Sequence, residues 1–312
     1  MARRCETVGF ILLALGIVPG LGAQADFKVD VNLVTLNVTV ADHNGKSIHD
    51  LPQDAFRVYE DGTPQQIRLF RHEDIPVAVG LVVDNSGSMR RKVPDVIAAA
   101  TEFARLSNPQ DQMFVVNFNE HVSLGLPEGE PFVSDPNELK AALEQIRAKG
   151  QTALYDAIAR AFEHIGKSPL EKKVVIVLSD GGDNVSRTGF PQVLTMLEES
   201  NVIVYTVGLF DDYDTDRNPG VLKRLARMSG GEAFFPTEIP DVMEVLQAVS
   251  RDIRSQYTIG YVPSNRSRDG TYRSVNVKLV ASHANRWLAR TRAGYVALPP
   301  ASAISPPETK DP

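Results

Sequence analysis

The residues Val77–Val83 form an unbroken apolar run, with no alternation of polar and apolar side chains. A strand with one face in water alternates, whereas a strand buried on both faces of a parallel sheet does not. Similar runs recur at Met113–Phe118, Val174–Leu178 and Val202–Val207. We therefore expect a buried, mostly parallel sheet in the middle of the chain.

Helical patterns lie between these runs, because apolar residues there are spaced by three or four positions. They are Val96, Ala100 and Phe103; Leu139, Leu143 and Ile146; and Leu154, Ile158, Phe162 and Ile165. A last helix is expected around Val242–Ile253. Strands that alternate with helices predict a doubly wound α/β domain, which we place at residues 75–254.

The two flanks read as β-structure. Val34, Leu36, Val38 and Val40 alternate with polar residues, as do Val275, Val277 and Leu279. Further strands are expected at Phe56–Tyr59 and Ile67–Phe70, which flank an Asp61-Gly62 turn signal, and at Tyr257–Val262. Neither flank buries much core alone, so the N-terminal region (26–74) and the C-terminal region (255–298) are expected to pair into one small β-sandwich. The tail (299–312), rich in Pro, Ser and Ala, is expected to be disordered.

The N-terminus has the pattern of an export signal. Arg3 and Arg4 precede the apolar stretch from Val8 to Leu21, and Ala23 and Ala25 match the small residues of a cleavage site. We expect residues 1–25 to be removed and the protein to be periplasmic or extracellular. The alternative, a membrane anchor, is disfavoured by Pro19 and by the short apolar length.

Composition excludes several classes of function. Lys and Arg number 33 against 39 Asp and Glu, for a net charge of −6, and neither sign forms long blocks, so a general nucleic-acid binder is excluded. The one cysteine, Cys5, lies in the predicted signal. The mature chain therefore has no disulfide, thiol nucleophile or cysteine-bound zinc.

Oxygen-bearing side chains cluster where predicted strands end. Asp84, Ser86 and Ser88 follow the first buried run, Thr152 opens a helix, and Asp180 follows the run Val174–Leu178. The carboxyl edge of a parallel sheet is where open α/β folds bind ligands. Hydroxyls with few carboxylates suit Mg²⁺, with Mn²⁺ or Ca²⁺ as alternatives.

These three motifs resemble the metal-ion-dependent adhesion site of the von Willebrand factor type A domain, with Asp-x-Ser-x-Ser, then a loop threonine, then a strand-end aspartate. The resemblance covers about Val77–Ile253, and the flanks resemble exported bacterial proteins of this family. It implies a Rossmann-like fold, metal binding by Asp84, Ser86, Ser88, Thr152 and Asp180, and no catalysis. It also implies adhesion to a protein whose acidic side chain completes the metal's coordination.

Two other classes of function remain open. One is a structural envelope protein in which the metal only holds loops together. The other is a metal-dependent hydrolase, which is disfavoured because no phosphate-binding glycine loop with lysine occurs and neither His121 nor His164 pairs with a nucleophile in the sequence. Asp183 and Asn184 are either close to the site or part of an ordinary turn. The acidic loop of Asp211, Asp212, Asp214 and Asp216 departs from a calcium-binding pattern, because Arg217 replaces the turn glycine.

Overall fold

The computed structural model describes residues 33–43, 45–145, 148–210, 216–280 and 286–299. The predicted export signal with Cys5, the tail beyond Pro299, and Asp211, Asp212 and Asp214 lie outside these described residues. Within them, no helix is both long and apolar enough to cross a membrane.

A six-stranded sheet forms the centre of the fold, in the order β10-β9-β8-β5-β6-β7. Its strands are β5 (Val77–Asp84), β6 (Gln112–Phe118), β7 (Val122–Leu124), β8 (Lys172–Ser179), β9 (Val202–Gly208) and β10 (Ala233–Phe234). All neighbouring strands are parallel except β6 and β7. Every residue of β5 is buried. The prediction of a buried, mostly parallel sheet is therefore confirmed.

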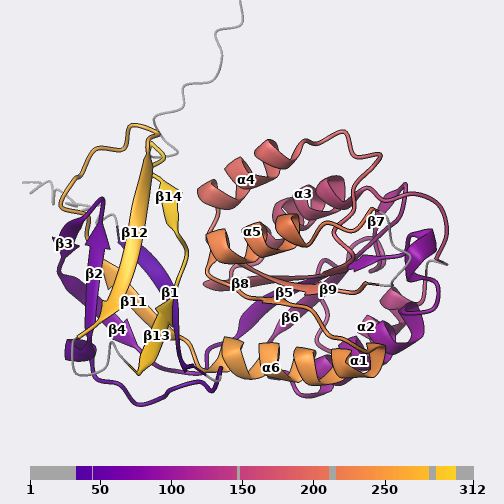
Figure 1. The fold of residues 1–312 in the computed structure, drawn as a ribbon, viewed down its shortest axis with the longest axis horizontal. Coiled ribbons are helices and arrows are strands. Elements are labelled where there is room, and N and C mark those ends of the chain that lie inside the picture. Colours follow the sequence, from indigo (N-terminus) through magenta and orange to yellow (C-terminus); the bar gives the residue numbers. More distant parts are fainter. Residues whose placement is uncertain (1–32, 44, 146–147, 211–215, 281–285, 300–312) are drawn as a thin grey trace, which may run out of the picture. The chain divides into compact units, whose positions relative to one another are not determined.

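Helices cover both faces of this sheet (Figure 1). They are α1 (Val93–Arg105), α2 (Pro136–Leu143), α3 (Leu154–Ile165), α4 (Phe190–Glu199), α5 (Pro219–Ser229) and α6 (Val242–Arg254). Helices α1, α2 and α6 share one apolar core with the sheet, and α3, α4 and α5 share the other. Short 3-10 turns occur at Gln53–Ala55, Gly87–Met89 and Ile239–Asp241. The doubly wound α/β class is confirmed.

The flanking segments form two four-stranded antiparallel sheets, with the orders β13-β1-β11-β4 and β14-β12-β2-β3. Their strands are β1 (Val34–Asp42), β2 (Phe56–Glu60), β3 (Thr63–Gln65), β4 (Ile67–Arg71), β11 (Tyr257–Tyr261), β12 (Tyr272–Leu279), β13 (Trp287–Arg290) and β14 (Gly294–Val296). Each sheet contains strands from both ends of the chain, and both contribute to a single apolar core. This arrangement is the sandwich that the alternating patterns predict.

The Asp61-Gly62 turn does not join the two strands, Phe56–Tyr59 and Ile67–Phe70, that were expected to flank it. Asp61 and Gly62 have φ angles of 47° and 77°, values suited to a tight hairpin turn. The turn pairs β2 with β3, the segment immediately after it. The strand β4 instead pairs with β11 in the opposite sheet. A two-residue turn fixes the register of its own hairpin, so a strand starting five residues after Gly62 is not its partner.

Candidate metal-binding site

The chain brings the predicted ligands to the carboxyl edge of the central sheet. Asp84 is the last residue of β5, and Ser86 and Ser88 lie in the tight turn between β5 and α1. Asp180 directly follows β8, which is the neighbour of β5. Because neighbouring parallel strands end at the same edge, the two aspartates lie near each other.

Four of the five predicted ligands belong to one hydrogen-bonded group. The Ser88 hydroxyl donates to Asp180 Oδ2 over 2.8 Å, and the Ser86 and Ser88 hydroxyl oxygens are 3.1 Å apart. The backbone N–H of Ser86 donates to Asp84 Oδ1 over 2.8 Å. The Ser179 hydroxyl donates to Asp84 Oδ2 over 2.6 Å, so both carboxylate oxygens of Asp84 are held in place.

Thr152 is connected to this group through the backbone of its loop. The N–H of Gly87 donates to the carbonyl of Gly150 over 3.1 Å, which ties the first loop to the loop before α3. Thr152 is buried and donates its N–H to Asn184 Oδ1 over 2.9 Å. Its hydroxyl makes no contact with the other four predicted ligands among the hydrogen bonds of the described residues. The structure thus places Thr152 on the adjoining loop.

The electrostatics of the site are unfavourable without a cation. Asp84 is fully buried and Asp180 is 4% exposed, and neither forms an ion pair with a described lysine or arginine. Burial, and secondly the charge of Asp180, raise the pKa of Asp84 to about 6. Buried carboxylates that are close together cannot both ionise without cost unless a positive charge compensates them.

The donors fit a hard divalent cation. Two carboxylates and three hydroxyls are oxygen ligands of the kind that Mg²⁺ takes, with water completing its shell. Among the described residues, no group of three or more His, Cys, Asp or Glu side chains could hold a metal. A site here therefore needs its serine and threonine oxygens, and the soft-ligand chemistry of zinc or copper does not fit.

Sequence reasoning missed Ser179 and left Asp183 and Asn184 undecided. Ser179 holds Asp84, while Asn184 receives the N–H of Thr152. Asp183 accepts the N–H of Tyr155 in the first turn of α3 and the hydroxyl of Ser186. The only sequence signal for Ser179 was its place beside Asp180. These three side chains orient the loops that carry the predicted ligands.

The two histidines of the central domain lie away from the site serines. His164 is buried and its Nε2 lies 2.7 Å from the carbonyl of Pro131, and burial lowers its pKa. His121 is exposed, and its backbone N–H donates to Asn119. Among the hydrogen bonds of the described residues, neither histidine contacts Ser86 or Ser88, so no serine–histidine pair forms there.

Comparisons with known proteins agree with this fold. Residues 79–182 match the family model of the von Willebrand factor type A domain. Mouse integrin alpha-X is 24% identical in an alignment of 184 residues, which covers 53% of this chain and 15% of the integrin. This chain therefore spans only a small part of that relative.

Two solved structures have similar folds. A von Willebrand factor type A protein from Catenulispora acidiphila is 14% identical, with a TM-score of 0.51, over 84% of this chain and 74% of that one. Proximal thread matrix protein 1 from the mussel byssus is 16% identical, with a TM-score of 0.50, over 62% and 50% of the two chains. At these identities the structures establish a common fold.

Proposed function

Because this chain is a von Willebrand factor type A domain protein, we propose that it binds a partner protein through a divalent cation at the carboxyl edge of its central sheet. One observation carries the proposal: Asp84 and Asp180 are both buried, close enough for Asp180 to raise the pKa of Asp84, and have no described cationic partner. Buried charges in proteins are normally paired or coordinate metals.

Residues from three loops of this chain would coordinate the cation. Asp84, Ser86 and Ser88 would hold the ion from one loop, with Thr152 and Asp180 completing the protein's share from the other two. A bound Mg²⁺ supplies a positive centre that accepts one further oxygen ligand. Ser88 is half-buried and Gly87 is exposed, so this side of the site is open to a partner. An aspartate or glutamate of the partner is the matching ligand.

Binding without catalysis is the activity that these groups support best. The described residues place neither His121 nor His164 beside the site serines, and Ser88 gives its hydroxyl to Asp180. A hydrolase needs a base or a positioned water at that point. The structural alternative, in which the ion only holds loops together, predicts metal binding without a metal-dependent partner.

The predicted export signal at residues 1–25 indicates where in the cell the protein acts. We propose a mature chain that begins near Asp26 and works in the periplasm or outside the cell. N-terminal sequencing of the exported protein tests this, because retention of residues 1–25 in a membrane fraction would favour the anchor instead.

Affinity capture tests the adhesion proposal. The immobilised mature chain is incubated with native envelope extract in Mg²⁺, then in EDTA, and with extract whose carboxyl groups have been amidated. We expect a partner that is retained only with Mg²⁺ and unmodified carboxyls, and that is lost with Asp180→Ala. Asp95→Ala, a matched change at an exposed position of α1, should behave as wild type. Capture that is indifferent to EDTA and to amidation would exclude the proposed function.

A further inference from the structure

A cavity of about 950 Å³ lies beside helix α6 and strand β1. Its wall includes Ser250 and Arg251 of α6, Thr39 of β1, and Lys46 from the segment after β1. Pockets that bind small molecules in proteins have volumes of about 300–1,000 Å³. None of the five predicted metal ligands lines this cavity. It is therefore a candidate ligand site that is separate from the metal site.

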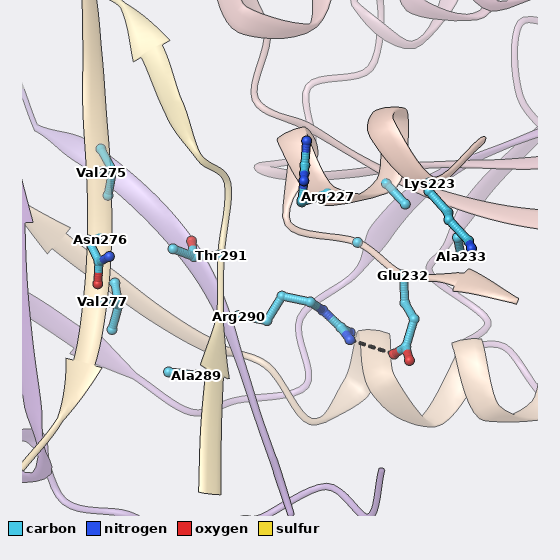
Figure 2. A pocket seen from close by; sticks show the side chains of 12 residues that line it. Lys223, Arg227, Glu232, Ala233, Val275, Asn276, Val277, Ala289, Arg290 and Thr291 are labelled. Carbon is cyan, nitrogen blue, oxygen red and sulfur yellow. Dashed lines mark hydrogen bonds and ion pairs between the residues drawn. The ribbon is translucent and has the colours of Figure 1, made fainter. Parts of the chain in front are cut away.

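The carboxylates in the wall of this cavity are already neutralised. They are Glu232 and Asp252, and both form ion pairs with Arg290. Figure 2 shows the pair of Arg290 with Glu232, which also lines a neighbouring cavity of about 440 Å³. Arg254, another residue of the wall, pairs with two aspartates that do not line it. The described wall thus has no unpaired carboxylate that would repel an anion.

Two cations of the wall have no carboxylate partner. Lys46 and Arg251 are exposed, and neither forms an ion pair within the part of the chain that the structure describes. His49 and His72 also line the cavity, and their rings stack with centroids 5.9 Å apart. Neither imidazole forms a hydrogen bond with another described residue, and an imidazole N–H can donate one. The wall therefore offers positive charge and hydrogen-bond donors.

Two buried hydroxyls of the wall add further donors. Ser250 is 9% exposed and Thr39 is 3% exposed. The hydroxyl of Ser250 has no hydrogen-bond partner among the described residues. The hydroxyl oxygen of Thr39 accepts from Gln256 Nε2 over 3.5 Å, but its proton has no described acceptor. Leaving a buried polar group without a partner is costly, so an acceptor oxygen inside the cavity would be favourable.

We propose that this cavity binds a small organic or inorganic anion with two or more carboxylate or phosphate groups. Lys46 and Arg251 would compensate its charge, while Thr39 and Ser250 would donate hydrogen bonds to its oxygens. Anionic acceptors are the chemistry that all four side chains share. A cationic ligand fits less well, because the carboxylates of the wall are already paired with Arg290.

Titration calorimetry on the metal-free mature chain tests this proposal. The metal is removed with EDTA, and the EDTA is then dialysed away, because it is itself a polyanion. The probes are propane-1,2,3-tricarboxylate and pyrophosphate, and the neutral control is propane-1,2,3-tricarboxamide. We expect at least one anion to bind, which identifies carboxylate or phosphate as the preferred group. The triamide should bind at least about tenfold more weakly.

Two double variants with the same change of charge localise the binding. Lys46→Glu/Arg251→Glu should weaken anion binding at least about tenfold. Lys223→Glu/Arg227→Glu changes two exposed cations of α5 that line only the neighbouring cavity (Figure 2), and should bind as wild type. Ser250→Ala should weaken binding by about three- to tenfold, since it removes one hydrogen bond to a charged group.

NMR of the histidine rings gives a second measurement of the same event. The anion should shift the C–H signals of His49 and His72, which line the cavity, and leave those of His121 and His164, which do not. Binding of neither anion, equally tight binding of the triamide, or an equal loss in the two double variants would each overturn the proposal. Shifts at His121 or His164 without shifts at His49 and His72 would overturn it as well.

Discussion

Ser88 donates its hydroxyl to Asp180 over 2.8 Å, although 92 residues separate them in the sequence. This bond joins the loop after β5 to the loop after β8, at the edge where both strands end. The bond connects the first and the last motif of the predicted metal site directly, without an ion between them. The proposed cation at this edge would therefore face the buried carboxylates of both Asp84 and Asp180.

Asp84→Asn should leave the metal-free protein as stable as wild type, or up to about 2 kcal/mol more stable, at pH 7. The change removes one of two buried carboxylate charges and keeps an oxygen that can accept a hydrogen bond from Ser179 or Ser86. Val82→Ala, in the buried middle of the same strand, should instead cost about 1–3 kcal/mol. Urea unfolding in EDTA measures both. If Asp84→Asn lowered the free energy of unfolding as much as Val82→Ala does, repulsion between Asp84 and Asp180 would not be significant.

Asn184→Ala should weaken Mg²⁺ binding by about tenfold without abolishing it. Asn184 does not belong to the predicted ligands but accepts the N–H of Thr152, so its loss should loosen the Thr152 loop. Titration calorimetry with Mg²⁺ measures the effect. Asn201→Ala, at an exposed position before β9, is the matched control. If the two variants bound Mg²⁺ with equal affinity, Asn184 would not contribute to holding the Thr152 loop for the metal.

Lys172 should make stability depend on pH in the alkaline range. Its ammonium is buried and donates to the carbonyl of Ile253 over 2.9 Å. Burial, and secondly the charge of Arg254, lower the pKa of Lys172 to about 8. Between that value and the usual 10.5 the unfolded chain binds more protons than the folded one, so the free energy of unfolding should rise with pH.

The rise should amount to about 1–3 kcal/mol between pH 7.5 and 10. Lys172→Met should remove this slope, whatever its effect on stability at neutral pH. Urea titrations at pH 7.5, 8.5 and 9.5 compare the two proteins. If both show the same slope, another group is responsible.

Deleting residues 26–70 should expose the C-terminal strands to protease. The strand β1 pairs with both β11 and β13, and β2 pairs with β12, so the deletion removes their neighbours. Buried residues of the shared core, such as Tyr257 and Val277, would then face water. Limited proteolysis should cut within residues 257–296 in the shortened chain, but not in a chain that lacks residues 300–312. Equal resistance in the two chains would contradict a shared core.

Local sequence patterns predicted the central domain well because its signals are local. The apolar run of β5 and the oxygen-bearing residues directly after β5 and β8 are each readable without a partner strand. Once the strands are parallel neighbours, Asp84 and Asp180 must lie at one edge. The location of the candidate site therefore followed from the order of the strands.

Contacts between distant segments were not predictable in the same way. Period-two alternation identifies β4 as a strand but does not say that it pairs with β11 instead of β2. The bond from Ser179 to Asp84 depends on strand register. The ion pair of Arg290 with Asp252 connects β13 to α6. The local sequence of neither segment indicates this contact. Such pairs require three-dimensional packing to be known.

The most direct test of the central claim is a thermal melt of wild type and Asp84→Asn, each in saturating Mg²⁺ and in EDTA. Metal that binds only the folded state should raise the melting temperature of wild type by several degrees, since a hundredfold excess over Kd adds about 2.7 kcal/mol. The melting temperature of Asp84→Asn should not change with Mg²⁺. Equal melting temperatures of wild type in the two conditions would contradict the metal site, and with it the proposed adhesion through that site.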